Sequence, residues 1–148
     1  MPLLRTTSEN PDYQKFVVLL DATLKILDGD DHEFYDQFNK SDAIKNVVVF
    51  YNGNQPLGCG AFKFYENKTV EIKRMYVLPE YRGKGIAHQI LTELEKWAKE
   101  LAYNTCVLET GIKQVEAIGL YQKAGYAVIP NYGQYQGVEN SVCMRKSI

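Results

Sequence analysis

The sequence predicts an α/β fold in which helices flank a mixed, mostly antiparallel sheet. Stretches with helical spacing alternate with strand-like stretches, and a series of hairpins joins the strands near the middle of the chain. The expected order of elements is β-α-α-β-β-β-α-β-α-β-β. We expect residues 1–148 to form a single domain, because this length can bury one core and no linker or repeat interrupts it.

Local signals set most of the expected element boundaries. Asn10 can cap a helix that has Pro11 at its first position. Asn52 and Gly53 predict a tight turn between two strands, and Asn67 predicts a second turn. The expected elements are, in order, a strand over 2–7, helices over 11–28 and 33–38, strands over 47–52, 57–65 and 69–77, a helix over 86–101, a strand over 105–110, a helix over 115–123, and strands over 125–129 and 141–146.

Composition argues against several classes of protein. The formal net charge is −1 and the isoelectric point is about 6.1, so bulk charge does not favour nucleic acid or a membrane surface as a partner. No apolar run is long enough to span a bilayer, and the first residues lack the features of a signal peptide, so we expect a cytoplasmic protein. Cys59, Cys106 and Cys143 are expected to be buried reduced thiols, and His32 and His88 are too few and too far apart to predict a metal site.

Residues 81–91, YRGKGIAHQIL, join a strand to a helix through two glycines and two cations. A helix N-terminus presents unpaired backbone N–H groups and the positive end of the helix dipole. Gly83 and Gly85 let that backbone approach a bulky anion, and Arg82 and Lys84 add positive charge. We therefore interpret this stretch as a phosphate-binding loop. The alternative is a turn that tolerates glycine and carries solvated cations.

Two familiar phosphate loops do not fit this spacing. A P-loop needs a hydroxyl residue directly after its Gly-Lys pair, where this chain has Gly85. The dinucleotide fingerprint needs a third glycine where this chain has His88. The pattern that remains is Arg-x-x-Gly-x-Ala, from Arg82 to Ala87.

This pattern and a second one resemble the motifs of the GNAT family of N-acetyltransferases, whose glycine loop holds the pyrophosphate of acetyl-coenzyme A. The second pattern, QVEAIGLYQKAGYAV over 114–128, is similar to the family's Asn-x-x-Ala-x-x-x-Tyr-x-Lys-x-Gly-Phe, with Gln114 where the family usually has Asn. The resemblance covers roughly residues 45–130. It implies the GNAT fold, acetyl-CoA as co-substrate without a metal, and cofactor-binding roles for Met75, Tyr76, Val77, Arg82, Gly83, Lys84, Gly85, Ile86, Ala87, Gln114 and Lys123.

The activity that the resemblance implies is acetyl transfer to a small-molecule or peptide amine. No Ser-His-Asp or Cys-His grouping is evident, so direct attack in a ternary complex is the simpler scheme. Tyr121, the tyrosine of the second motif, is the predicted general acid, and a core tyrosine is the alternative. A backbone N–H near Met75 to Val77 is the expected donor to the oxyanion, because the family's sheet splays beside this strand.

Glu71 is the predicted general base. It lies on the strand that leads into the glycine loop and, counted back from Arg82, matches a carboxylate that some family members use. Glu109 is the second candidate and a water chain is the third, and a partnered structural role is the alternative for either carboxylate. Simple alternation along the strand would place Glu71 on the same face as Lys73, Met75 and Val77.

The sequence says little about the acceptor. Acidic residues within 27–38 could attract a cationic amine, although a solvated acidic surface is the explanation that we favour. Tyr132, Tyr135 and Glu109 are candidate substrate-binding residues, and packing of a surface loop is the alternative for the tyrosines. A non-catalytic acyl-CoA sensor of the same fold and a nucleotide-phosphate enzyme are the competing functions. A homodimer is left open.

Overall fold

The computed structural model describes residues 2–29 and 43–148 and is built around a seven-stranded sheet with the order β1-β2-β3-β4-β5-β7-β6. Neighbouring strands are antiparallel except β4 and β5, which are parallel. The strands are β1 (Leu3–Thr6), β2 (Asn46–Asn52), β3 (Gln55–Glu66), β4 (Thr69–Val77), β5 (Thr105–Gly111), β6 (Ala127–Ile129) and β7 (Ser141–Ser147). The predicted fold class is confirmed. The helix expected over 33–38 lies outside the described residues.

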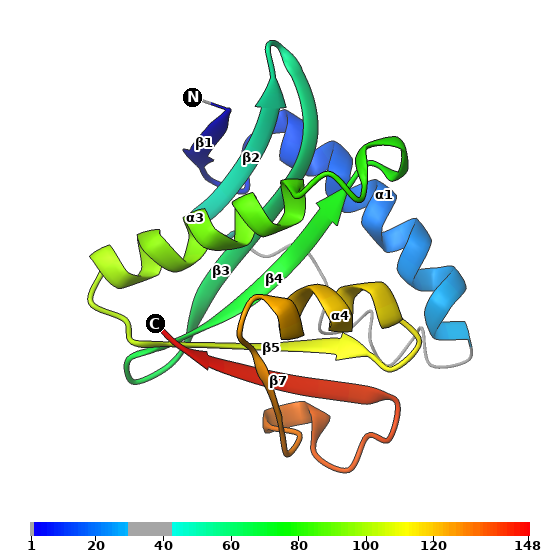
Figure 1. Cartoon of the computed structure of the whole chain (residues 1–148), viewed down its shortest axis with the longest axis vertical. Helices are drawn as coiled ribbons and strands as arrows, with labels where there is room; N and C mark the ends of the chain where they lie inside the picture. Colours follow the sequence, from blue (N-terminus) through cyan, green and yellow to red (C-terminus); the bar gives the residue numbers. More distant parts are fainter. Residues whose placement is uncertain (1, 30–42) are drawn as a thin grey trace.

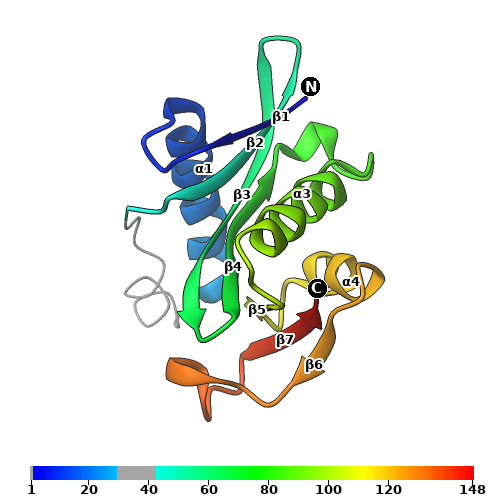
Figure 2. The same cartoon turned by 90° about the vertical axis from the view of Figure 1, so that its left-hand side faces the viewer.

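Helices cover both faces of this sheet. Helix α1 (Pro11–Asp28) lies on one face, and α3 (Ile86–Glu100) and α4 (Val115–Lys123) lie on the other (Figures 1 and 2). The larger core lies between the sheet and α3 and α4, and a second core lies under α1. A small third cluster surrounds the single-turn helix η3 (Gly133–Tyr135), which belongs to the connection between β6 and β7.

The helix cap at Asn10 and the first hairpin turn show how accurately local sequence signals predict element boundaries. The side chain of Asn10 accepts hydrogen bonds from the N–H groups of Asp12 and Tyr13 at 2.9 and 3.0 Å, so the predicted N-cap of α1 is confirmed. The first hairpin turn lies one residue later than predicted. Asn52 pairs with Gln55, so the central residues are Gly53 and Asn54, and Gly53 takes the positive φ of 61°.

Strand β4 contains a bulge that simple alternation does not anticipate. Its register against β3 pairs Lys73 with Ala61 but Tyr76 with Cys59, so β4 has one more residue than β3 in this interval. Arg74 lies in the bulge with a φ of 58°, a conformation that few residues other than glycine adopt.

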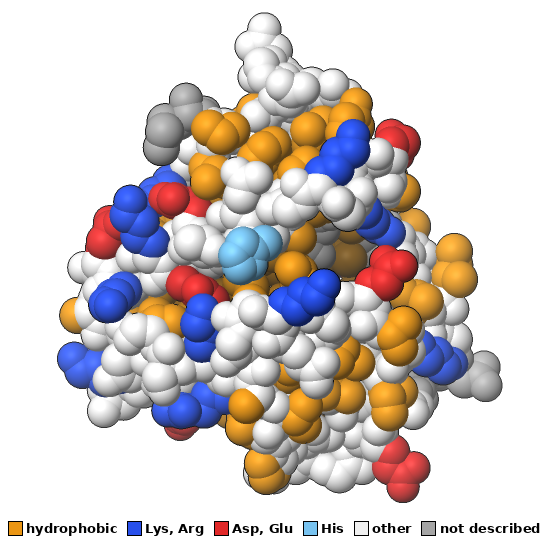
Figure 3. Space-filling model, in the orientation of Figure 1, with side chains coloured by type: hydrophobic (Ala, Val, Ile, Leu, Met, Phe, Trp, Pro, Cys, Tyr) orange, Lys and Arg blue, Asp and Glu red, His pale blue; other side chains and the backbone are white. Residues whose placement is uncertain are grey.

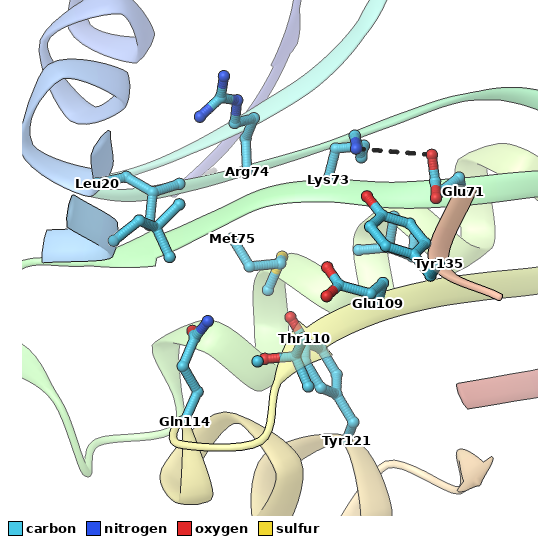
Figure 4. A pocket seen from close by; sticks show the side chains of 13 residues that line it. Leu20, Glu71, Lys73, Arg74, Met75, Glu109, Thr110, Gln114, Tyr121 and Tyr135 are labelled. Carbon is cyan, nitrogen blue, oxygen red and sulfur yellow. Dashed lines mark ion pairs between the residues drawn. The ribbon is translucent and has the colours of Figure 1, made fainter. Parts of the chain in front are cut away.

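The bulge exchanges the two faces of β4 beyond Lys73. Val77 is buried in the α3 core and Met75 packs against that core, whereas Tyr76 is buried under α1. Glu71 and Lys73 project to the other side of the sheet, and Figure 4 shows Lys73 and Met75 pointing apart. The prediction that Met75 and Val77 share a face with Glu71 is therefore wrong, because the extra residue shifts the alternation.

The parallel pair β4 and β5 separates soon after it forms. Among the described residues, β4 and β5 are paired only between Thr69–Glu71 and Thr105–Val107. Beyond this point β4 continues along β3 and β5 continues along β7, and the two strands diverge (Figure 1). The divergence opens the sheet between Ile72–Val77 and Leu108–Gly111, and we call this opening the β4–β5 gap.

All three cysteines are buried with free thiols, as expected. Burial raises the pKa of Cys106 to about 12 and that of Cys143 to about 11, so neither thiol is a thiolate at neutral pH. None of the helices in the described part of the chain is long and apolar enough to cross a bilayer.

Candidate active site

The loop between β4 and α3 has the conformation that its glycines predict. Gly83 and Gly85 have φ angles of 76° and 81°, and a Cβ built on either would meet no atom within 4 Å. Glycine is therefore needed here for backbone conformation, and the space in front of the loop is open. Gln89 donates to the carbonyl of Gly85 at 3.1 Å, the first bond of α3, so the N–H groups of residues 86–88 have no partner within the helix.

Two cations flank this open backbone. The Nε of Arg82 donates to the carbonyl of Val77 at 2.8 Å, and its guanidinium lies 5.4 Å from the ring centre of Tyr76, so the loop is fastened to the end of β4. The ammonium of Lys84 lies 5.5 Å from the ring centre of Tyr81. Figure 3 shows that this face of the molecule is hollowed, with hydrophobic side chains inside the hollow and charged ones at its rim. The loop can therefore receive an anion through backbone N–H groups and fixed positive charge.

A pocket enclosing about 700 Å³ of empty space, part of it open to solvent, occupies the β4–β5 gap. Its wall comes from elements far apart in sequence, and Figure 4 shows the side chains converging on the gap. The lining residues are Leu20 and Leu24 of α1, residues 71–75 of β4, residues 109–111 of β5, Gln114, Tyr121 of α4, and Tyr135 of η3.

Tyr121 reaches the pocket from α4. Its side chain is 7% exposed, and in Figure 4 it extends from the helix toward Glu109 and Thr110. Burial, and then the negative charge of Glu109, raise the pKa of the Tyr121 phenol well above its ordinary value of 10.0. The phenol therefore keeps its proton at neutral pH and is available as a hydrogen-bond and proton donor.

Glu71 lies at the inner end of the gap and is already engaged. It is 3% exposed, and its Oε2 accepts a 2.6 Å hydrogen bond from the hydroxyl of Tyr132. Its Oε1 lies 3.7 Å from the Nζ of Lys73. Burial lowers the pKa of Lys73, and the charge of Glu71 opposes that shift. Both oxygens of Glu71 thus face a donor from the protein.

Glu109 occupies the middle of the gap. It comes from β5, and Figure 4 shows its carboxylate pointing into the space between Met75 and Tyr135. Its negative charge contributes to the raised pKa values of Tyr121 and Tyr135. The second carboxylate predicted from the sequence therefore lies within electrostatic reach of the predicted acid.

The structure brings some of the predicted site residues together and separates others. Met75, Gln114, Tyr121, Glu71, Glu109 and Tyr135 all line the pocket. Tyr132 lies behind Glu71 and bonds to it. Arg82 to Ala87 form the loop at the start of α3, Tyr76 and Val77 are buried on opposite faces of β4, and Lys123 is exposed on α4 away from the pocket lining.

Seven lining residues were not among the site residues predicted from the sequence: Leu20, Leu24, Ile72, Lys73, Arg74, Thr110 and Gly111. The two leucines are four residues apart on α1, a helical spacing of apolar residues that by itself indicates core packing. Arg74 and Thr110 carry no sequence signal of their own, since their positions depend on the bulge and on the divergence of the strands. Within residues 2–29 and 43–148, His, Cys, Asp and Glu side chains form no group of three that could hold a metal ion.

Known proteins resemble the chain in sequence. An IAA acetyltransferase of Azospirillum brasilense is 36% identical over 93 residues, which are 62% of this chain and 61% of that protein. An uncharacterized N-acetyltransferase of Escherichia coli, YjgM, is 38% identical over 81 residues, which are 53% of this chain and 48% of YjgM. The chain thus spans about three fifths and about half of the length of these two curated relatives.

Solved structures resemble the chain over nearly its whole length. A protein of Klebsiella pneumoniae described as an acyl-CoA N-acyltransferase has a TM-score of 0.82 and 28% identity, with 98% of this chain and 95% of that chain covered. The PaiA N-acetyltransferase of Thermoplasma acidophilum, solved in complex with coenzyme A, has a TM-score of 0.73 and 18% identity over the full length of both chains.

The family model confirms what the two motifs and the divergent sheet indicate. The description of that model is the acetyltransferase (GNAT) family, and it matches residues 12–126, a range that includes α1 except its first residue, the glycine loop, the β4–β5 gap and α4. The chain belongs to the acetyltransferase (GNAT) family.

Proposed function

We propose that the chain transfers an acetyl group from acetyl-CoA to an amine by direct attack in a ternary complex. The observation that carries this proposal is the β4–β5 gap. Pairing between the two strands stops at Glu71, and Met75, Glu109 and Tyr121 converge in the opening. The pocket is lined by Leu20 of α1 from one face of the sheet and by Tyr121 of α4 from the other, so two substrates can meet there from opposite sides.

The glycine loop supports acetyl-CoA as the donor. Its open backbone, the N-terminus of α3 and the exposed cations Arg82 and Lys84 match the charge and bulk of a pyrophosphate. The complex of PaiA with coenzyme A, a protein of the same fold, favours the same donor. We assign the pyrophosphate to residues 82–87 and the remaining cofactor contacts to Met75, Tyr76, Val77 and Gln114. The exposed position of Lys123 favours at most a peripheral contact.

Three groups would then carry the chemistry. The Tyr121 hydroxyl gives its proton to the departing thiolate, and backbone N–H groups near Met75 to Val77 stabilise the oxyanion. For the proton of the amine we favour Glu109, because its carboxylate points into the gap beside Tyr121. Glu71, the base predicted from the sequence, stays the alternative, since both of its oxygens already face Tyr132 and Lys73.

Release of free thiol from acetyl-CoA in the presence of a panel of primary amines tests the function. The expected result is thiol release that depends on the amine, together with a product heavier than the amine by one acetyl group. A sensor of the same fold would bind acetyl-CoA and release no thiol with any amine. A nucleotide-phosphate enzyme would be stabilised against heat by ATP as strongly as by acetyl-CoA.

A further inference from the structure

The hydrogen bond between Tyr132 and Glu71 joins a connecting loop to the floor of the pocket. Tyr132 belongs to residues 130–140, the connection from β6 to β7, and Glu71 lies on β4, 61 positions away. The hydroxyl of Tyr132 donates to a carboxylate that is 3% exposed, at 2.6 Å. A short hydrogen bond from O–H to a charged, buried oxygen belongs to the strong class.

Aromatic contacts connect Tyr132 to the wall of the pocket. The ring of Tyr132 meets Tyr65 of β3 at 4.9 Å and Tyr135 of η3 at 5.9 Å between centroids, both in edge-on geometry. Tyr135 is 1% exposed and lines the pocket. Glu71 therefore fixes Tyr132 through a hydrogen bond, and Tyr132 packs against the ring of Tyr135, which forms one wall of the pocket.

The opposite wall comes from a different part of the chain. Leu20 of α1 lies across the pocket from Tyr135, with Glu109 and Met75 between them (Figure 4). Helix α1 is fixed by its own core under β2 to β4. The distance between the two walls thus depends on where residues 130–140 lie, and the hydrogen bond from Tyr132 to Glu71 attaches these residues to β4.

We propose that Tyr132 and Glu71 are positioning residues that hold Tyr135 as the wall of the acceptor chamber, and so limit the size of the amine that is accepted. This inference rests on the proposed function. It assigns Glu71 a role in acceptor selection and leaves proton transfer to another group. The glycine loop lies at the far end of β4, so acetyl-CoA binding does not depend on this link.

Tyr132→Phe tests the proposal most directly, because it keeps the ring contacts and removes only the hydroxyl. We expect the KM for a small amine to rise about tenfold, as the loss of one charge-assisted hydrogen bond implies. The KM for acetyl-CoA and kcat should stay near their wild-type values. Bulkier amines should gain relative to small ones, and amide hydrogen exchange over residues 130–140 should become faster.

Tyr51→Phe is the matched control. The hydroxyl of Tyr51 also donates to a carboxylate oxygen, Oδ2 of Asp12, at 2.6 Å, but neither residue lines the pocket. This variant should change neither the KM for the amine nor exchange over 130–140. The proposal is overturned when Tyr132→Phe behaves like Tyr51→Phe in both measurements.

Two other outcomes of these experiments also test the proposal. Where Tyr132→Phe does not fold, Glu71→Gln probes the same link, because its amide oxygen still accepts the hydroxyl but without charge, and unchanged amine KM and exchange would overturn the proposal. Where the wild-type protein releases no thiol with any amine, the proposed function fails, and faster exchange over 130–140 in Tyr132→Phe still supports the anchoring of the wall.

Discussion

The glycine loop and the β4–β5 gap are neighbouring parts of one site that are built in opposite ways. The loop uses consecutive residues, 82–87, and presents backbone N–H groups held by two glycines with positive φ. The gap uses side chains from α1, β4, β5, α4 and η3, which meet only because β4 and β5 diverge. The loop therefore depends on local conformation and the gap on topology. We expect changes in the loop to alter acetyl-CoA binding and changes in the gap to alter turnover or recognition of the amine.

Tyr121→Phe should give the largest effect, and it tests whether a side chain in the gap acts on turnover. Removal of a proton donor acts in the transition state, so kcat should fall on the order of a hundredfold or more while acetyl-CoA affinity stays near wild type. Steady-state kinetics and calorimetric titration measure the two quantities. Tyr103→Phe is the control, because Tyr103 also packs against the α3 core but does not line the pocket. Full activity of Tyr121→Phe would return the residue to a packing role.

The two glutamates should differ in which kinetic constant they affect. Glu109→Gln keeps the shape and removes the basicity, so kcat/KM at neutral pH should fall about a hundredfold. Part of this loss should return at high pH, where more of the amine is already unprotonated. Glu71→Gln should act mainly on the KM for the amine. A normal pH–rate profile for Glu109→Gln with an altered one for Glu71→Gln would move the base to Glu71.

Gly85→Asp tests the loop as a binding element. A non-glycine residue is strained at a φ of 81°, and a carboxylate would repel the phosphates, so acetyl-CoA affinity should fall about thirtyfold, or about 2 kcal/mol. Gly53→Asp introduces the same residue at another glycine with positive φ and open space, at the tip of the β2–β3 hairpin, and should leave affinity unchanged. Unchanged affinity in a folded Gly85→Asp protein would show that the loop does not bind the phosphates of acetyl-CoA.

A smaller effect concerns stability at alkaline pH. Burial raises the pKa of Tyr13 to about 12 and that of Cys106 to about 12, above the ordinary values of 10.0 and 9.0. The folded state thus holds these protons more tightly than the unfolded state, so their contribution to stability is complete below the ordinary pKa values and is lost as pH rises from those values to about 12. Each group adds a slope of about 1.4 kcal/mol per pH unit in that window. The melting temperature should be flat up to about pH 9 and then fall.

Tyr13→Phe isolates the contribution of Tyr13 to the loss of stability at alkaline pH. Among the described residues, the buried hydroxyl of Tyr13 has no hydrogen-bond partner, so its removal should not lower the melting temperature at pH 7. The alkaline fall should be shallower than in the wild type, since one titrating group is gone. An identical fall in the two proteins would show that Tyr13 does not contribute to it.

The sequence was most informative where a structural feature is confined to a few residues. The cap at Asn10 and the strand–glycine–helix junction at Gly83 and Gly85 depend on local conformation alone, and both were predicted correctly. The hairpin turn was predicted one residue early, because the Asn-Gly pair marks the turn but cross-strand pairing decides which residues occupy its centre. The bulge at Arg74 leaves no pattern in the sequence.

The contents of the gap were harder to predict because they depend on distant pairing. Glu71 and Tyr132 were named separately from the sequence, but their bond joins β4 to a loop that follows β6. Lys123 matches a family motif, yet its place on the helix turns it toward solvent. Motif spacing identifies residue types, whereas register, bulges and strand divergence decide which side chains meet.

The bulge in β4 also constrains how the chain can evolve. Loops usually tolerate insertions and deletions, and strands lose or gain residues readily only at their ends. A β4 strand of the same length without the bulge would alternate strictly, so Val77 would turn toward α1 and Tyr76 toward α3. Met75 would leave the side of the sheet on which it meets Tyr121, and the glycine loop would start from an inverted strand end. We therefore expect functional descendants that keep the length of this strand to keep the bulge as well, even where its side chains change.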